Sequence, residues 1–158
     1  MEIAYLETTF FSFYHDERTA SDIVAMRGWT KKFWDAHRGD YHLVTSPAVL
    51  DELRKGGAYH KEAALKMALE IPTVAGTSEV IGIVEAYIVN KVMPGNVTGD
   101  ALHLALASLH NCDYLVTWNC RHLANANKFK HIREINRRLG LKTPDLVTPL
   151  ELLGENEP

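Results

Sequence analysis

The sequence predicts an α/β domain, a three-layer α/β/α sandwich in which helices cover both faces of a mostly parallel central sheet. Short apolar runs of strand length alternate along the chain with longer segments whose apolar residues recur at helical spacing. Strands that alternate with helices in this way form a parallel sheet that is covered on both faces. The 158 residues are enough for one domain with a sizeable core, which we assign to residues 1–150, followed by a frayed tail at residues 151–158.

Five short apolar runs are the predicted strands, and they lie at residues 2–6, 41–45, 71–74, 114–117 and 146–148. Pro72 places the third of them at an edge of the sheet or at a strand end, because proline cannot donate to a ladder. An aromatic cluster at residues 10–14 follows the first run and is predicted to belong to the core or to an interface. The predicted helices lie at residues 19–37, 47–55, 59–69, 78–91, 99–111 and 127–139.

The composition excludes several classes of protein. No apolar run approaches the ~20 residues that a membrane-spanning helix needs. The first residues run directly into a strand pattern without the layout of a signal peptide, so we expect a cytoplasmic protein with no membrane contact. Cys112 and Cys120 are too few and too isolated for a disulfide framework or a zinc ribbon.

Four polar side chains are expected to meet at one edge of the sheet. They are Glu7 after the first strand, Glu52 on the helix after the second, Asp100 at the start of its helix, and Asn119 after the strand at residues 114–117. Strand ends and helix starts of a parallel sheet converge on the same edge, where ligands bind. Asp100 faces along an apolar stripe of its helix, and a buried carboxylate needs a cation, a metal ion or a proton.

Two other polar residues, Asp51 and His103, lie close in sequence to these candidates. On the helix at residues 47–55, Glu52 lies at the edge of the buried face and Asp51 lies nearly opposite it, so Glu52 is the better candidate. His103 lies on the mostly apolar helix that Asp100 begins, and it is predicted to be a hydrogen-bonded core histidine.

Oxygen ligands of this kind suit Mg²⁺ or Mn²⁺ better than zinc. Clustered carboxylates around such a hard cation are the usual apparatus of phosphodiester hydrolysis. Each side chain also has a simpler role open to it. Asp100 could serve the helix dipole, Glu52 could pair with a basic neighbour on its own helix, Glu7 could accept from backbone N–H groups, and Asn119 could form a turn. The convergence of three carboxylates on one edge favours the metal site.

A basic segment follows Asn119. Between residues 121 and 142 the chain carries seven lysines and arginines and a single carboxylate, Glu134. Most basic helices are simply solvated faces. Next to a carboxylate cluster, however, such a segment could hold a polyanion over a metal site.

The pattern resembles the PIN-domain family, and more closely its VapC-like toxins, the ribonucleases of bacterial toxin–antitoxin pairs. The resemblance rests on four motifs that span nearly the whole chain in the family's order, at residues 5–9, 46–53, 99–105 and 115–119. It implies that Glu52 and Asp100 match the family's second and third acidic positions and that Thr9 matches the hydroxyl of the first loop, beside the metal ligands. Glu7 and Asn119 depart from the pattern, because the family usually has aspartate at the first and an acidic residue at the second.

The resemblance implies a Mg²⁺- or Mn²⁺-dependent endoribonuclease, with Glu7, Glu52 and Asp100 as metal ligands and Asn119 as a further catalytic residue. Three carboxylates neutralise one divalent ion and are too few for two, so we expect one resident metal ion. The expected partners are RNA, a cognate antitoxin and a second copy of the chain. The candidates for contacts with RNA are Arg121, His122, Lys128 and Arg133.

A non-enzymatic alternative stays open, because Glu7 and Asn119 replace the usual residues. In it, a catalytically weakened PIN-like module binds RNA or a protein through the basic segment without cutting. A phosphoryl-accepting receiver domain fits less well, since no phosphorylatable aspartate follows the run at residues 71–74 and no lysine follows the run at residues 146–148.

Overall fold

The computed structural model describes residues 1–57, 60–93 and 98–154. A sheet of four parallel strands lies at its centre, in the order β2-β1-β3-β4. The strands are β1 (Ile3–Leu6), β2 (His42–Val44), β3 (Tyr114–Val116) and β4 (Asp145–Val147). Tyr5 pairs with Val44 on one side and with Leu115 on the other, so β1 is an inner strand and β4 an edge strand. The predicted α/β class with a parallel sheet is confirmed.

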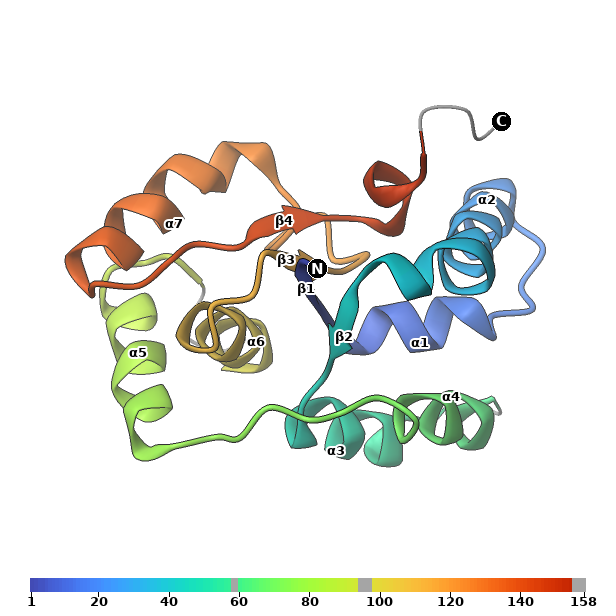
Figure 1. Ribbon diagram of the computed structural model, residues 1–158, viewed down its shortest axis with the longest axis horizontal. Helices are drawn as coiled ribbons and strands as arrows, with labels where there is room; N and C mark the ends of the chain where they lie inside the picture. Colours follow the sequence, from blue (N-terminus) through green and yellow to red (C-terminus); the bar gives the residue numbers. More distant parts are fainter. Residues whose placement is uncertain (58–59, 94–97, 155–158) are drawn as a thin grey trace.

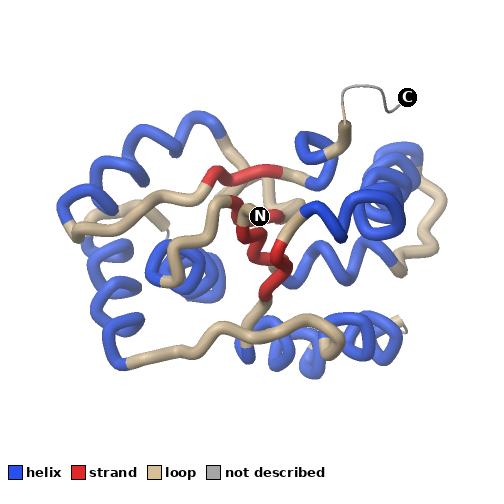
Figure 2. The backbone as a smooth tube through the Cα atoms, viewed as in Figure 1, coloured by secondary structure: helices blue, strands red, loops and turns tan. Residues whose placement is uncertain are grey.

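Helices lie on both sides of this sheet (Figures 1 and 2). Helices α5, α6 and α7 cover one side, α1 and α2 lie on the other, and α3 with α4 follows the edge strand β2 (Figure 1). The α-helices of the described residues are α1 (Thr8–Tyr14), α2 (Ser21–Lys32), α3 (Pro47–Lys55), α4 (Lys61–Ala68), α5 (Ser78–Val89), α6 (Thr98–Leu109) and α7 (Ala126–Arg138). A π-helix, η1 (Phe33–His37), extends α2, and two short 3₁₀ helices are η2 (Arg38–Asp40) and η3 (Pro149–Leu152).

Local sequence explains where the helices near the sheet's carboxyl edge begin. Ser46 caps α3 by accepting a hydrogen bond from the Val49 amide at 3.3 Å, and Pro47 fills the first helical position, where no N–H partner is needed. Helix α6 is apolar on nearly every side and is accordingly buried, with Leu104 and Ala105 fully enclosed between α5 and β3. Both helices therefore start at the edge where the strands end.

The predicted strand at residues 71–74 is wrong. The segment makes only an isolated bridge between Thr45 and Thr73, in which the Thr45 amide donates to Pro72 O and the Val74 amide donates to Thr45 O, each at 2.9 Å. Pro72 has no N–H to donate, and β2 itself has ended at Val44, so no ladder can form there.

The described part of the chain closes with η3. Glu151 and Leu152, the first residues of the expected tail, belong to this turn, and Leu152 is packed into the core. Residues 155–158 of the expected tail lie outside the described residues. The carboxylate of Glu151 holds this turn by accepting from the Thr148 amide at 2.9 Å. Within the described residues, no helix has the length and apolarity needed to cross a membrane.

Candidate metal centre

Glu7 lies where β1 ends and α1 begins, and it is almost completely buried. One of its carboxylate oxygens, Oε2, accepts three hydrogen bonds. The Thr9 amide and hydroxyl donate to it at 3.0 and 2.5 Å, and the Thr117 hydroxyl donates at 2.8 Å. Among the described residues no donor reaches the other oxygen, Oε1. Glu7 is thus held rigidly by one oxygen while the second stays available for a ligand.

Glu52 lies on α3 and reaches towards α1 and α6. The Thr8 hydroxyl donates to its Oε2 at 2.5 Å, and the imidazole of His103 contacts its Oε1 at 2.8 Å. A side chain at Gly99 would come within 3.1 Å of that same oxygen, so the glycine beside Asp100 makes room for the carboxylate. Asp51, by contrast, is exposed and pairs with Arg54 at 3.3 Å. The choice of Glu52 over Asp51 agrees with this geometry.

His103 is buried on α6 and has both ring nitrogens engaged. Its Nδ1 is 2.7 Å from the Tyr5 hydroxyl, which also contacts the Ser46 hydroxyl at 2.7 Å. Its Nε2 carries a proton, because a carboxylate can only accept and Glu52 lies opposite. The prediction of a hydrogen-bonded core histidine is confirmed. The structure adds that one of its partners is Glu52 itself.

The charges of Glu52 and His103 stabilise each other. Burial raises the pKa of Glu52, but the hydrogen bond and charge of His103 and the hydrogen bond from Thr8 outweigh it, so the pKa lies below its usual value. Burial lowers the pKa of His103, but the hydrogen bond to Glu52 and the negative charges of Glu7, Glu52 and Asp100 outweigh it, so this pKa is raised. The pair is therefore a glutamate–histidinium ion pair at mildly acidic pH.

Asp100 lies in the first turn of α6 and is buried. Its Oδ2 atom has no hydrogen-bond partner among the described residues. Burial raises its pKa, which a hydrogen bond from Asn119 and the charges of His122 and His103 only partly offset. A buried carboxylate oxygen without a donor is costly unless something positive sits beside it. A bound cation would offset the buried charge of Asp100 and give its Oδ2 atom a partner.

Glu7, Glu52 and His103 form a group that could hold a metal ion, with one ligand atom of each within 4.8 Å of the others. Asp100 lies outside this group, and its pKa still responds to the charge of Glu52. Because the Nε2 proton of His103 faces Glu52, we assign His103 the positioning of Glu52 and keep the ligand set to carboxylates. The free oxygen of Glu7 and the unpartnered oxygen of Asp100 are negatively charged groups that a cation could bind.

Asn119 forms the turn that follows β3. Its Oδ1 accepts from the amides of Arg121 and His122 at 3.3 and 3.0 Å, which is the turn role that the sequence left open. Its side chain is close enough to Asp100 to lower the pKa of that carboxyl. Asn119 therefore lies near Asp100, while its own oxygen accepts from the backbone.

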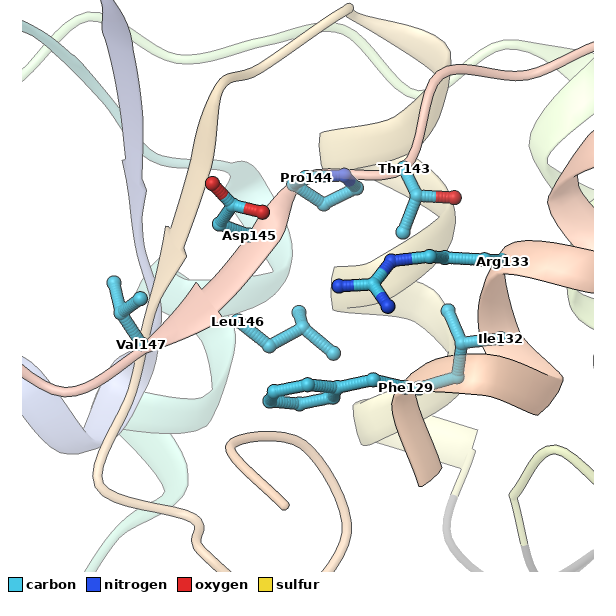
Figure 3. Close-up of a pocket in the computed structure, with 8 residues that line it drawn as sticks. All are labelled: Phe129, Ile132, Arg133, Thr143, Pro144, Asp145, Leu146 and Val147. Atoms are coloured by element: carbon cyan, nitrogen blue, oxygen red, sulfur yellow. The ribbon is translucent and has the colours of Figure 1, made fainter. Parts of the chain in front are cut away.

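The four basic candidates are dispersed. Arg121 is exposed at the turn, and His122 lies close enough to Asp100 to affect its pKa. Lys128 is half-buried and donates to Val92 O at 3.3 Å. Arg133 lies about 10 Å further along α7 than Ala126, given the rise of a helix, and faces β4 (Figure 3). Of the four, His122 is the one whose charge acts on a carboxylate of the site.

The sequence analysis missed two hydroxyl groups of this site. Thr8 holds Glu52, and Thr117 holds Glu7 while accepting from the Asn119 amide at 2.9 Å. Thr9, predicted to lie beside the ligands, donates to Glu7 and accepts from the Trp118 amide at 2.8 Å, joining β1 to β3. The consecutive threonines after Glu7 were the available signal. Which of them faces which carboxylate depends on the turn into α1.

No protein-family model matches the chain, and no curated protein matches it. The site is therefore interpreted from its own geometry.

Proposed function

We propose that the protein is a metal-dependent endoribonuclease of the PIN-domain, VapC-like type, which hydrolyses phosphodiester bonds of RNA with Mg²⁺ or Mn²⁺. One observation carries the proposal. Two glutamates from separate elements, the buried Glu7 and the partly buried Glu52, are held by hydrogen bonds at the carboxyl edge of the sheet, and Asp100 has a buried oxygen without a partner among the described residues. Such an edge of a parallel sheet is where α/β proteins bind their ligands.

In this proposal some residues of the site bind the metal ion and others position the residues that bind it. Glu7, Glu52 and Asp100 would hold the ion, which when bound activates a water molecule and offsets charge on the phosphate. Thr9 and Thr117 fix Glu7, and Thr8 with His103 fixes Glu52, so the carboxylates are oriented before substrate arrives.

Substrate has room beside Glu52. A cavity of about 200 Å³ adjoins its carboxylate, and Thr8, Ser12 and Lys61 are among the residues that line it. Its hydroxyl and ammonium groups suit one phosphate group of the RNA backbone. Arg121 and His122 belong to the turn after β3, where their amides donate to Asn119 Oδ1, and we assign them contacts with the RNA backbone.

The test is cleavage of RNA by the purified protein in Mg²⁺ or Mn²⁺, with EDTA as the blank. Replacing a ligand removes several kcal/mol of charge stabilisation, so Glu52→Gln and Asp100→Asn should each lower the rate by about a hundredfold or more. Asp51→Asn, one position along α3 and exposed, should cleave like the unchanged protein. Cleavage that persists in EDTA, or at full rate in Asp100→Asn, would overturn the proposal.

The turn role of Asn119 favours one second candidate, a PIN-like module that binds RNA or protein without cutting. Its oxygen is engaged by two backbone amides, so the site has three carboxylates where the family has four. In that case the unchanged protein would shift RNA in a gel but never shorten it in either metal.

The proposal includes three partners, which are RNA, a restraining antitoxin and a second copy of the chain. An apolar surface on α5 supports the homodimer. Ile81 and Val89 are 63 and 78 % exposed on one side of that helix, next to a hollow between α5 and α6. Exposed apolar patches of this kind mark interaction sites.

A further inference from the structure

A second cavity lies between α7 and the edge strand β4 and is lined by none of the three carboxylates of the proposed site (Figure 3). We call it the α7–β4 groove. Its volume is about 170 Å³, and its floor is formed by the apolar side chains of Phe129, Ile132 and Leu146. Ligand pockets usually measure about 300–1,000 Å³, so this groove fits one side chain of a larger ligand rather than a whole small molecule.

The strand that borders the groove has one edge that no other described strand pairs with. Within the described residues β4 pairs with β3 alone, through the Asp145 amide, which donates to Asp113 O, and Val147 O, which accepts from the Thr117 amide, both at 2.9 Å. Alternate residues of a parallel strand direct their backbone groups to opposite sides. The N–H and C=O of Leu146 therefore face away from β3, where an added strand could bind them.

The cation at the groove has no carboxylate partner within the described part of the chain. The guanidinium of Arg133 crosses the groove above the ring of Phe129, 5.8 Å from its centroid (Figure 3). Asp145 points to the other side of the strand in the same view, away from Arg133. Arg137 and Arg138, one turn further on, are both paired with Glu134. The groove thus carries a positive charge that is not neutralised.

We propose that the α7–β4 groove binds an extended acidic peptide segment of a partner protein. The segment adds to β4 as a further strand through the backbone of Leu146, places one apolar side chain on the floor at Phe129, and sets a carboxylate against Arg133. Strand addition of this kind draws affinity from main-chain hydrogen bonds and selectivity from side-chain pockets. RNA matches the groove less well, because its floor is aliphatic and aromatic carbon and its border is a peptide edge.

The probe is a fluorescein-labelled peptide of eight residues that repeats Glu-Thr-Leu-Thr, so that glutamate and leucine point to the same face of the strand, and its binding to the full chain is followed by fluorescence anisotropy. A charge-assisted hydrogen bond contributes about 1.5–3 kcal/mol, so Arg133→Gln should weaken binding by about tenfold or more. Arg138→Gln lies on the same helix, is paired with Glu134 and does not line the groove, and it should bind like the unchanged protein.

Two altered probes separate the parts of the proposal. A peptide N-methylated at alternate amides cannot add as a strand and should lose binding, and one with lysine in place of glutamate should also lose it. Equal binding of the three peptides, or equal loss in Arg133→Gln and Arg138→Gln, would overturn the proposal. So would a single-stranded RNA that displaces the peptide and itself depends on Arg133, or a dimer that Arg133→Gln dissociates.

Discussion

Asp100 has a carboxylate whose hydrogen-bonding capacity the described fold leaves partly unsatisfied. Its carboxylate is buried, and one of its oxygens has no hydrogen-bond partner among the described residues. A carboxyl whose pKa is raised by burial costs stability whenever the pH keeps it ionised, and the cost is relieved as the pH falls through the raised pKa. The destabilising carboxylate is thus the one that the proposed function requires as a negatively charged metal ligand.

Asp100→Asn should therefore stabilise the metal-free protein at neutral pH, by roughly 0.5–2 kcal/mol, as removal of a strained functional group commonly does. Urea unfolding in EDTA at pH 7 measures this, and the gain should shrink as the pH falls and the carboxyl of the unchanged protein becomes neutral. Asp51→Asn, on the exposed side of α3, should change the free energy of unfolding by no more than about 0.5 kcal/mol. A destabilised Asp100→Asn would show that the carboxylate is satisfied in solution.

The Glu52–His103 pair should give stability its own pH dependence. The lowered pKa of Glu52 means that its contribution is present above the unfolded value of about 4.3 and is lost as the pH falls further. The raised pKa of His103 means that its contribution is present below about 6.5 and is lost as the pH rises through the folded value. Both contributions are present together between these two values.

The difference in melting temperature between the unchanged protein and His103→Gln, measured without metal, should therefore be largest from about pH 4.3 to 6.5. It should decline on both sides of that window. His103→Gln also alters packing, but that part of the difference does not change with pH. A flat difference from pH 4 to pH 9 would contradict the ion pair.

At the level of single residues, the sequence predicts the charged groups of the site better than the neutral ones that hold them. Glu7 and Glu52 follow predictable strand ends, and the structure brings them into one group. The contacts of His103 with Tyr5 and Glu52 join residues 98 and 51 positions apart. Such pairings depend on how α3 and α6 meet, which no local pattern encodes.

Among the elements, helix α1 shows where local pattern fails. Its seven residues are threonines, aromatics and a serine, all poor helix formers, and the sequence indicated only an aromatic cluster there. Glu7 caps the helix, and burial of Phe10 and Phe11 stabilises it against the π-helix η1, where Phe33 meets Phe10 edge-on. Tertiary packing thus creates the helix that carries Thr8 and Thr9 into the site.

The strand at residues 71–74 fails for the opposite reason. Its apolar run was sufficient for a strand, but a ladder also needs a partner of matching length, and β2 ends at Val44. The remaining elements had both the periodicity and clear boundaries, such as Ser46-Pro47 before α3 and Gly56 after it, and they lie close to their predicted positions.

For the whole molecule, the proposed carboxylate site would couple folding to metal binding. Glu7, Glu52 and Asp100 come from β1, α3 and α6 and come together only in the folded chain, so an ion bound by all three stabilises the native state by mass action. The same ion must compete with the proton on His103 for the charge of Glu52. Metal binding should therefore weaken as the pH falls and His103 becomes positive.

The melting temperature of the unchanged protein at pH 7.5 should accordingly rise with added Mn²⁺. At one hundred times the dissociation constant the gain is about 2.7 kcal/mol, and each kcal/mol raises the melting temperature of a domain of this size by roughly 2–4 °C. Glu52→Gln should lose most of the rise, and Asp51→Asn should keep it. Asp100→Asn should melt above the unchanged protein in EDTA and respond little to Mn²⁺, which separates the loss of a ligand from the loss of the fold. An equal rise in all four proteins would place the ion elsewhere.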